Sequence, residues 1–138
     1  MITLIVGKKG SGKTKKLIER ANEAIENSNG NVVVIEKGLK LTYDISHQAR
    51  LIDSDAYEIQ GADALSGFIS GICAGNYDVT DIFIDSTLKI IGQDMKVLHC
   101  FTEKMNALSA LADTKITLLV SVDPNELPKE ISAVSVQI

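Results

Sequence analysis

The chain has 138 residues, of which 45% are hydrophobic, so it can fill one packed core and is too short for two typical domains. Its net charge of −4 and pI of about 5.1 argue against a nucleic-acid-binding surface, which needs clustered Lys and Arg. The first apolar run ends at Gly7, and no stretch approaches the ~18 apolar residues of a membrane span, so we expect a cytoplasmic protein without a secretory leader or membrane contact.

The N-terminal third of the sequence predicts two buried strands with a helix between them. Runs of β-branched residues at 2–6 and 32–35 are typical of parallel strands that are covered on both faces. From Lys13 onward apolar residues recur at helical spacing, and we expect this helix to stop at Gly30. The polar stretch 37–48 follows the second strand and predicts a loop.

The middle of the sequence predicts two short strands and a helix that contains glycine. Residues 50–52 and 57–59 are weak strand candidates, and Asp63 is expected to cap the helix that comes next. Three glycines recur every four residues on that helix: Gly67, Gly71 and Gly75. Because glycine weakens a helix, we expect these positions to serve tight packing on the sheet rather than contact with a partner helix.

The last third of the sequence returns to the same alternation. A strand is predicted at 82–84, a longer amphipathic helix over 98–112 and another buried strand at 116–120. Two prolines bracket a turn at 124–128, and residues 134–138 predict a final edge strand.

Strands that are separated by helices favour a parallel sheet, because each crossover must return the chain to the same edge. We therefore predict the α/β fold class, with a three-layer arrangement in which a mostly parallel sheet is flanked by helices. The whole chain, residues 1–138, is expected to form a single domain.

Residues 7–14 fit the pattern G-x-x-x-x-G-K-[ST] at every defined position. Its glycines allow the backbone to turn several N–H groups toward a bound phosphate, and the helix that begins near Lys13 adds the positive end of its dipole. The ammonium of Lys13 suits the terminal phosphates, and the hydroxyl of Thr14 suits Mg²⁺. The expected phosphate-binding residues are Gly7, Lys8, Lys9, Gly10, Ser11, Gly12, Lys13, Thr14 and Lys15.

This motif, placed between a buried strand and a helix, resembles the Walker A motif of the P-loop NTPase superfamily, and the resemblance covers most of the strand–helix alternation. It implies that Lys13 is the Walker A lysine, that Thr14 ligates magnesium, and that Asp85, at the end of an apolar strand, is the Walker B aspartate. Lys13 and Asp85 are then the expected catalytic residues, and Thr14 and Asp85 the expected metal ligands. The implied ligands are ATP and Mg²⁺; GTP is less expected, because the N-K-x-D tetrad typical of GTPases is missing.

The groups that fast catalysis requires are less evident in the sequence. Many P-loop ATPases have a glutamate directly after the Walker B aspartate, whereas Ser86 and Thr87 follow Asp85 here. Nucleotide kinases of the superfamily close an arginine-bearing lid over the phosphates, but this chain has only Arg20 and Arg50. An NTPase activity is thus an open expectation.

Two further residues, Ser121 and His47, are weaker candidates for a functional role. Ser121 could sense the terminal phosphate if its strand lies beside the loop strand, as a polar residue does in the branch of recombinases and helicases; an ordinary strand terminus is the alternative. His47 gives the chain a faint likeness to the core of type II thymidine kinases, but it lacks their glutamate and their zinc lobe.

The leading hypothesis is therefore an ATP-binding P-loop protein with slow or partner-stimulated hydrolysis. One alternative is a small-molecule or nucleoside kinase with an acceptor pocket in residues 37–60. Another is a non-catalytic nucleotide sensor whose bound state recruits a protein partner. The short chain and its few arginines also favour assembly into a homo-oligomer.

Overall fold

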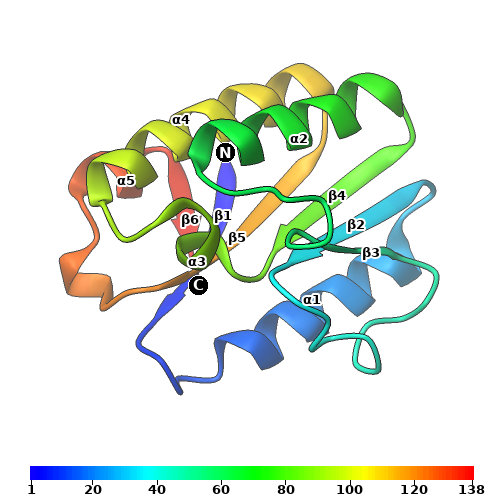
Figure 1. The fold of residues 1–138 in the computed structure, drawn as a ribbon, viewed down its shortest axis with the longest axis horizontal. Coiled ribbons are helices and arrows are strands. Elements are labelled where there is room, and N and C mark those ends of the chain that lie inside the picture. The colour runs from blue at the N-terminus through cyan, green and yellow to red at the C-terminus, as the bar shows by residue number, and fades with distance from the viewer.

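Short runs of β-branched and other apolar residues form six strands that pair in one sheet (Figure 1). The computed structural model describes residues 1–138. The strand order is β3-β2-β4-β5-β1-β6, and every neighbouring pair is parallel. The strands are β1 (Ile2–Gly7), β2 (Asn31–Glu36), β3 (Arg50–Asp53), β4 (Val79–Ile84), β5 (Lys115–Ser121) and β6 (Ser135–Gln137).

Helices cover both faces of this sheet, so the predicted three-layer α/β fold is confirmed. α1 packs on one face, and the other helices pack on the opposite face (Figure 1). They are α1 (Lys13–Asn27), α2 (Ala62–Gly75), α3 (Thr87–Ile91), α4 (Met95–Ala112) and α5 (Lys129–Ala133), with a 3₁₀ helix at Pro124–Glu126. None of them combines the length and hydrophobicity that crossing a membrane requires.

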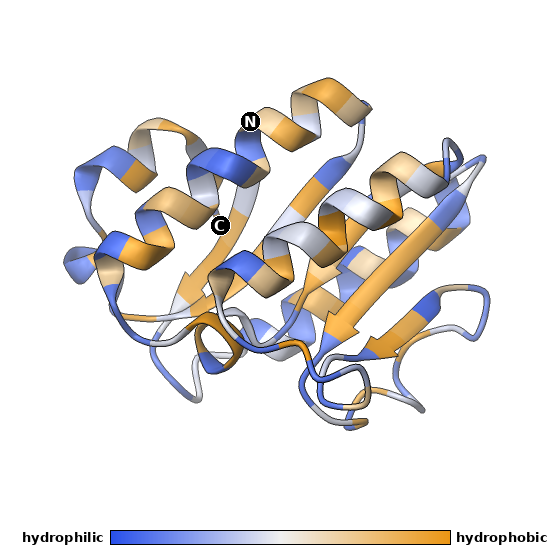
Figure 2. Ribbon diagram, turned by 45° about the horizontal axis from the view of Figure 1, so that its top comes forward, coloured by the Kyte–Doolittle hydropathy of each residue, from blue (hydrophilic) through white to orange (hydrophobic).

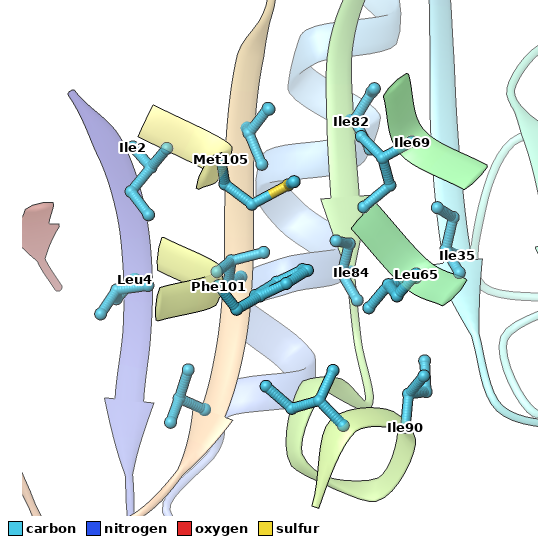
Figure 3. Packing of buried hydrophobic residues seen from close by; sticks show 14 of the residues in the cluster. Ile2, Leu4, Ile35, Leu65, Ile69, Ile82, Ile84, Ile90, Phe101 and Met105 are labelled. Atoms are coloured by element: carbon cyan, nitrogen blue, oxygen red, sulfur yellow. The ribbon is translucent and has the colours of Figure 1, made fainter. Parts of the chain in front are cut away.

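Two apolar clusters fill the spaces between the sheet and its helices. In the larger one, α2 and α4 place Leu65 and Phe101 over buried strand residues such as Ile84 (Figure 3). The smaller cluster lies under α1 and includes Leu17 and Ala21. Figure 2 shows that the central strands are hydrophobic along most of their length, as burial on both faces requires.

Several local predictions are wrong. Residues 57–59 form no strand, because Glu58 has a left-handed φ of 55° in a turn, and Ile59 is apolar because it packs into the core. Asp63 lies in the first turn of α2 but does not cap it; the capping position belongs to Gly61. The short helices α3 and α5 were not predicted, since five residues are too few to show a helical period.

The glycines have different roles from those predicted. A Cβ atom built on Gly67, Gly71 or Gly75 would meet no atom of a neighbouring element, so these residues do not pack tightly on the sheet. α1 ends at Asn27, before Gly30 is reached. A Cβ on Gly30 would collide with the carbonyl oxygen of Asp78, so this glycine permits a close approach between two chain segments.

Exchanging glycine for alanine should therefore have opposite effects at these two places. Gly30→Ala is expected to lower the free energy of unfolding by about 1–3 kcal/mol, because the backbone at Asp78 must shift. Gly71→Ala, the matched substitution at an open helical position, is expected to raise it by about 0.5–1 kcal/mol through helix propensity. Urea unfolding of both variants measures this difference, and a stable Gly30→Ala protein would contradict the close approach.

The loop predicted at 37–48 is present, and contacts to α1 fix its position. Leu41 and Ile45 are buried in the smaller apolar cluster. The side chain of Asn22 on α1 bonds both sides of the turn: its amide donates to the carbonyl of Asp44 at 3.0 Å, and its oxygen accepts from the N–H of Ser46 at 3.0 Å. This polar stretch is therefore an ordered part of the α1 face.

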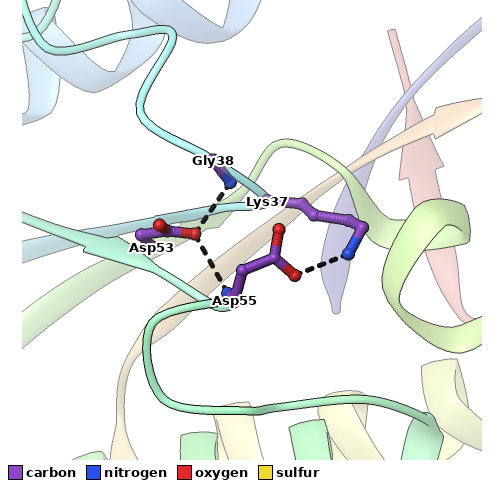
Figure 4. A network of polar contacts seen from close by, with 4 residues as sticks. All are labelled: Lys37, Gly38, Asp53 and Asp55. Atoms are coloured by element: carbon purple, nitrogen blue, oxygen red, sulfur yellow. Dashed lines mark hydrogen bonds and ion pairs between the residues drawn. The ribbon is translucent and has the colours of Figure 1, made fainter.

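The start of this loop is also tied to the end of β3 (Figure 4). One carboxylate oxygen of Asp53 accepts from the N–H groups of Gly38 and Asp55, and the ammonium of Lys37 pairs with the Asp55 carboxylate. The connections after β2 and β3 are thus joined at the carboxyl edge of the sheet.

Candidate functional site

The glycine-rich segment connects the carboxyl end of β1 to the amino end of α1. β1 lies inside the sheet, between β5 and β6, so the segment stands over the carboxyl edge rather than at a side of the sheet. In parallel α/β folds this edge is where ligands bind, because the connections diverge there and leave a crevice.

Glycine suits several positions of this segment for different reasons. Gly10 and Gly12 have φ values of 84° and 85°, which side chains with a Cβ rarely adopt. A Cβ on Gly7 would collide with the side chain of Ser11. The segment is therefore a compact turn, closed by a bond from the N–H of Ser11 to the carbonyl of Lys8 at 3.1 Å.

Several backbone N–H groups of this turn and of the first turn of α1 have no acceptor within the protein. They belong to Lys9, Gly10, Gly12, Lys13 and Thr14. The same five residues line a cavity of about 490 Å³. Unpaired amides at the start of a helix, together with the positive end of its dipole, are well suited to bind an anion.

The ammonium of Lys13 lies within this turn. Its side chain is buried to 7% exposure, and its Nζ donates to the carbonyl of Lys8 at 2.7 Å. Burial lowers the pKa of Lys13 below its ordinary value, and the charge of Asp85 opposes this effect. A buried ammonium with one neutral acceptor would gain from an anionic partner, since charge-assisted hydrogen bonds are about twice as strong as neutral ones.

The cavity brings together only part of the predicted site. Asp85 and the five residues with unpaired amides line it, whereas Gly7, Lys8, Ser11 and Lys15, which were also predicted, do not. Lys8 instead pairs with Asp123, which follows β5, at 3.4 Å. The remaining lining residues come from the segment after β4 and from β5: Ser86, Thr87, Leu88, Lys89, Gln93, Leu119 and Ser121.

Asp85 follows β4 directly and is the only carboxylate that lines the cavity. Its Oδ2 accepts from the Ser86 hydroxyl at 3.2 Å, while its Oδ1 is buried without a partner. Burial raises the pKa of Asp85, and the Ser86 hydroxyl and the charges of Lys89, Lys40 and Lys13 oppose the rise.

An unpaired buried carboxylate oxygen needs a cation or a donor, so this site fits Mg²⁺. Asp85 and the hydroxyl of Thr14 are the side chains that would hold the ion, together with phosphate oxygens, because no cluster of three His, Cys, Asp or Glu residues is present. A bound Mg²⁺ would supply positive charge to those phosphate oxygens.

β5 lies between β1 and β4, so Ser121 at the end of β5 is on the strand next to β1, which ends at Gly7. Gly7 and Ser121 are register partners at the ends of β1 and β5, and Ser121 lines the cavity. The condition set for Ser121 in the sequence analysis, that its strand lies beside the loop strand, is therefore met.

The two arginines lie away from this cavity. Arg20 lines a larger cavity of about 910 Å³, together with the starts of β1 and β5 at Met1 and Lys115. Arg50 is the first residue of β3 and lines a third cavity of about 760 Å³. The larger cavity lies toward the amino edge of the sheet, whereas the third extends along β3 to Ile52 and Tyr57, and neither shares a residue with the cavity at the glycine-rich turn.

Glu36, the last residue of β2, was not predicted as a site residue; it is fully buried beside the site. Its two carboxylate oxygens accept from the N–H groups of Lys40 and Leu41 at 2.7 and 3.1 Å. Glu36 does not line the cavity, so it holds the loop and offers no free oxygen to a ligand. The signal for it was weak, because one acidic residue after a strand is also typical of a surface turn.

Glu36 should make stability depend on pH. Burial raises its pKa above the ordinary value of 4.5; the two backbone N–H groups oppose the rise, and the charges of Asp85 and Asp53 add to it. The folded state therefore holds the proton more tightly, and this contribution is complete below pH 4.5 and lost as pH rises through the folded pKa.

In wild type the free energy of unfolding should therefore decline as pH rises above about 4.5, and Glu36→Gln is expected to make this decline less steep. The loss of the hydrogen bond that the substitution removes lowers stability at every pH and does not change the slope. Urea unfolding at a series of pH values measures the slope. The exposed Glu26 on α1 provides the control, Glu26→Gln, and an equal slope in wild type and Glu36→Gln would contradict the effect.

In comparisons with known proteins, the chain matches no protein-family model and no curated protein.

Proposed function

We propose that this protein binds ATP with Mg²⁺ as a member of the P-loop NTPase superfamily, and that it hydrolyses the nucleotide slowly or under stimulation by a partner. One observation carries the proposal. Five residues with unpaired backbone amides, one of them Lys13, line the same cavity as Asp85, whose Oδ1 is buried without a partner. An anion and a cation held together would satisfy both sets of groups.

Slow turnover is supported by what lines the cavity. Hydrolysis needs a group that orients or deprotonates water, but the only carboxylate there is Asp85, the proposed metal ligand. Glu36 has both oxygens engaged by backbone amides. A partner or a second subunit would then supply the missing group.

The kinase alternative receives less support. The cavity of about 760 Å³ is lined by His47 and other residues of the 37–60 segment, where an acceptor pocket was expected. It is also lined by Asn31 and Val79, the first residues of β2 and β4. None of its lining residues is shared with the cavity at the glycine-rich turn, so a substrate bound there would not meet the terminal phosphate directly.

Calorimetric titration with ATP and GTP, each with and without Mg²⁺, tests the proposal. We expect ATP to bind and Mg²⁺ to strengthen the binding. Steady-state phosphate release on the better nucleotide then separates the functions: release without an acceptor supports an ATPase, and binding without release supports a sensor. A protein that binds neither triphosphate would contradict the proposal.

A further inference from the structure

The short helix α3 presents one ammonium group to the candidate site. Its sequence is Thr87-Leu88-Lys89-Ile90-Ile91, and every side chain except that of Lys89 is buried. The carbonyl of Ile90 also accepts from the N–H of Gly61 at 2.9 Å, which joins α3 to the start of α2. Four buried residues in five fix the orientation of this helix, so the direction of Lys89 is set by packing.

Lys89 lines the same cavity as the glycine-rich turn but reaches it from a different connection of the sheet. It comes from the segment after β4, whereas Lys9 and Lys13 come from the segment after β1. Lys89 makes no hydrogen bond and no ion pair within the protein, in contrast to Lys8 and Lys13. An exposed lysine is often only a solvated charge, but this one shares a cavity with five residues whose amides are unpaired.

Apart from Lys89 and from Lys9 and Lys13 of the glycine-rich segment, no Lys or Arg lines the cavity. Arg20 and Arg50 line two other cavities and not this one. Lys40 stands near Asp85 but does not line the cavity. A charge that neutralises a phosphate from outside the glycine-rich segment must therefore come from Lys89 or from another molecule.

We infer that Lys89 contacts the terminal phosphate of the bound triphosphate, in the same cavity as Lys13. This inference rests on the proposed function. During hydrolysis the oxygen of water bonds to the γ-phosphorus while the bond from that phosphorus to the bridging oxygen breaks. The bridging oxygen keeps the electron pair in ADP, and the proton of water passes to the released phosphate. An ammonium at the γ-phosphate oxygens lowers the cost of their negative charge throughout this step.

The test compares ATP with ADP, because only ATP carries the phosphate in question. For Lys89→Met we expect the affinity for Mg²⁺-ATP to fall by about tenfold, as for one charge-assisted contact, while the affinity for ADP changes less than about twofold. Lys89→Arg should restore most of the lost affinity. Calorimetry on the full chain measures both constants, and phosphate release adds kcat and KM.

Lys115→Met is the matched control, because Lys115 is an exposed lysine at the start of β5, about 20 Å of strand before Ser121, and does not line the cavity. If Lys89→Met leaves the ratio of ATP to ADP affinity at the wild-type value, the inference is wrong and the proposed function stands. If the wild-type protein binds no ATP, both are wrong. An equal loss for ATP and ADP would also contradict a contact to the terminal phosphate.

Discussion

Lys13→Ala is expected to lower the affinity for Mg²⁺-ATP by about 100-fold or more, because it removes the ammonium that would bond to the terminal phosphates. The fold should persist. The side chain makes only one hydrogen bond within the protein, to the carbonyl of Lys8, and its buried charge is costly without an anion. Calorimetric titration measures the loss, and thermal unfolding checks the fold.

Lys16→Ala provides the control for that experiment. Lys16 is exposed, lies on the same helix three residues after Lys13, and does not line the cavity. It should leave ATP affinity within about twofold of the wild-type value, since a solvated lysine contributes little at short range. If Lys13→Ala bound the triphosphate as tightly as this control, phosphate binding by the glycine-rich turn would be ruled out.

Asp85→Asn should separate stability from function. We expect the Mg²⁺-dependent part of ATP affinity to fall by about tenfold or more, because the amide cannot replace a carboxylate at the ion. In the absence of nucleotide the same variant should unfold at a higher temperature than the wild type at neutral pH, since burial raises the pKa of Asp85 and charging it there costs stability. Titrating the metal at fixed ATP and recording thermal unfolding measure the two effects.

Asp81→Asn is the corresponding control on the same strand. Asp81 lies toward the amino end of β4, where one of its oxygens accepts from the Thr80 hydroxyl at 2.8 Å. Asp81→Asn should leave the metal titration unchanged and should not raise the unfolding temperature above that of the wild type. An Asp85→Asn protein with an unchanged metal titration would remove Asp85 from the site, and one that unfolds at a lower temperature would contradict the cost of its buried charge.

These results would bear on the same physical feature, a cavity lined by backbone amides and a carboxylate oxygen that have no hydrogen-bond partner. The free amides belong to the glycine-rich turn and the start of α1, and the unpaired oxygen belongs to Asp85, which follows β4. Such groups reduce the stability of the free protein, which is common at binding sites. Tight binding of Mg²⁺-ATP should therefore stabilise the fold as well.

Much of the fold could be predicted because its signals are local. A run such as Val32-Val33-Val34-Ile35 is buried on both faces whatever its neighbours are, and the helical spacing after Lys13 continues for four turns. Predictions failed where the signal was short or ambiguous. Ile59 is apolar because of core packing and not because of strand structure, and α3 has too few residues to reveal a period.

The candidate site divides in the same way. Gly10, Gly12, Lys13 and Thr14 lie within five consecutive residues, so their backbone geometry follows from local sequence, and the positive φ values of both glycines agree with it. The position of Lys89 in the cavity could not be predicted, because it depends on how α3 packs under the rest of the chain.

The sequence by itself determined that strands and helices alternate, that the sheet is parallel, and where a turn rich in unpaired amides stands. These properties depend on residues a few positions apart, whose dihedral preferences and hydrophobic spacing are set locally. Only the tertiary structure decided that β5 separates β1 from β4, that Ser121 and Lys89 reach one cavity with Lys13, and that both arginines line other cavities. The order of strands results from packing between segments far apart in the chain, which local preferences do not specify.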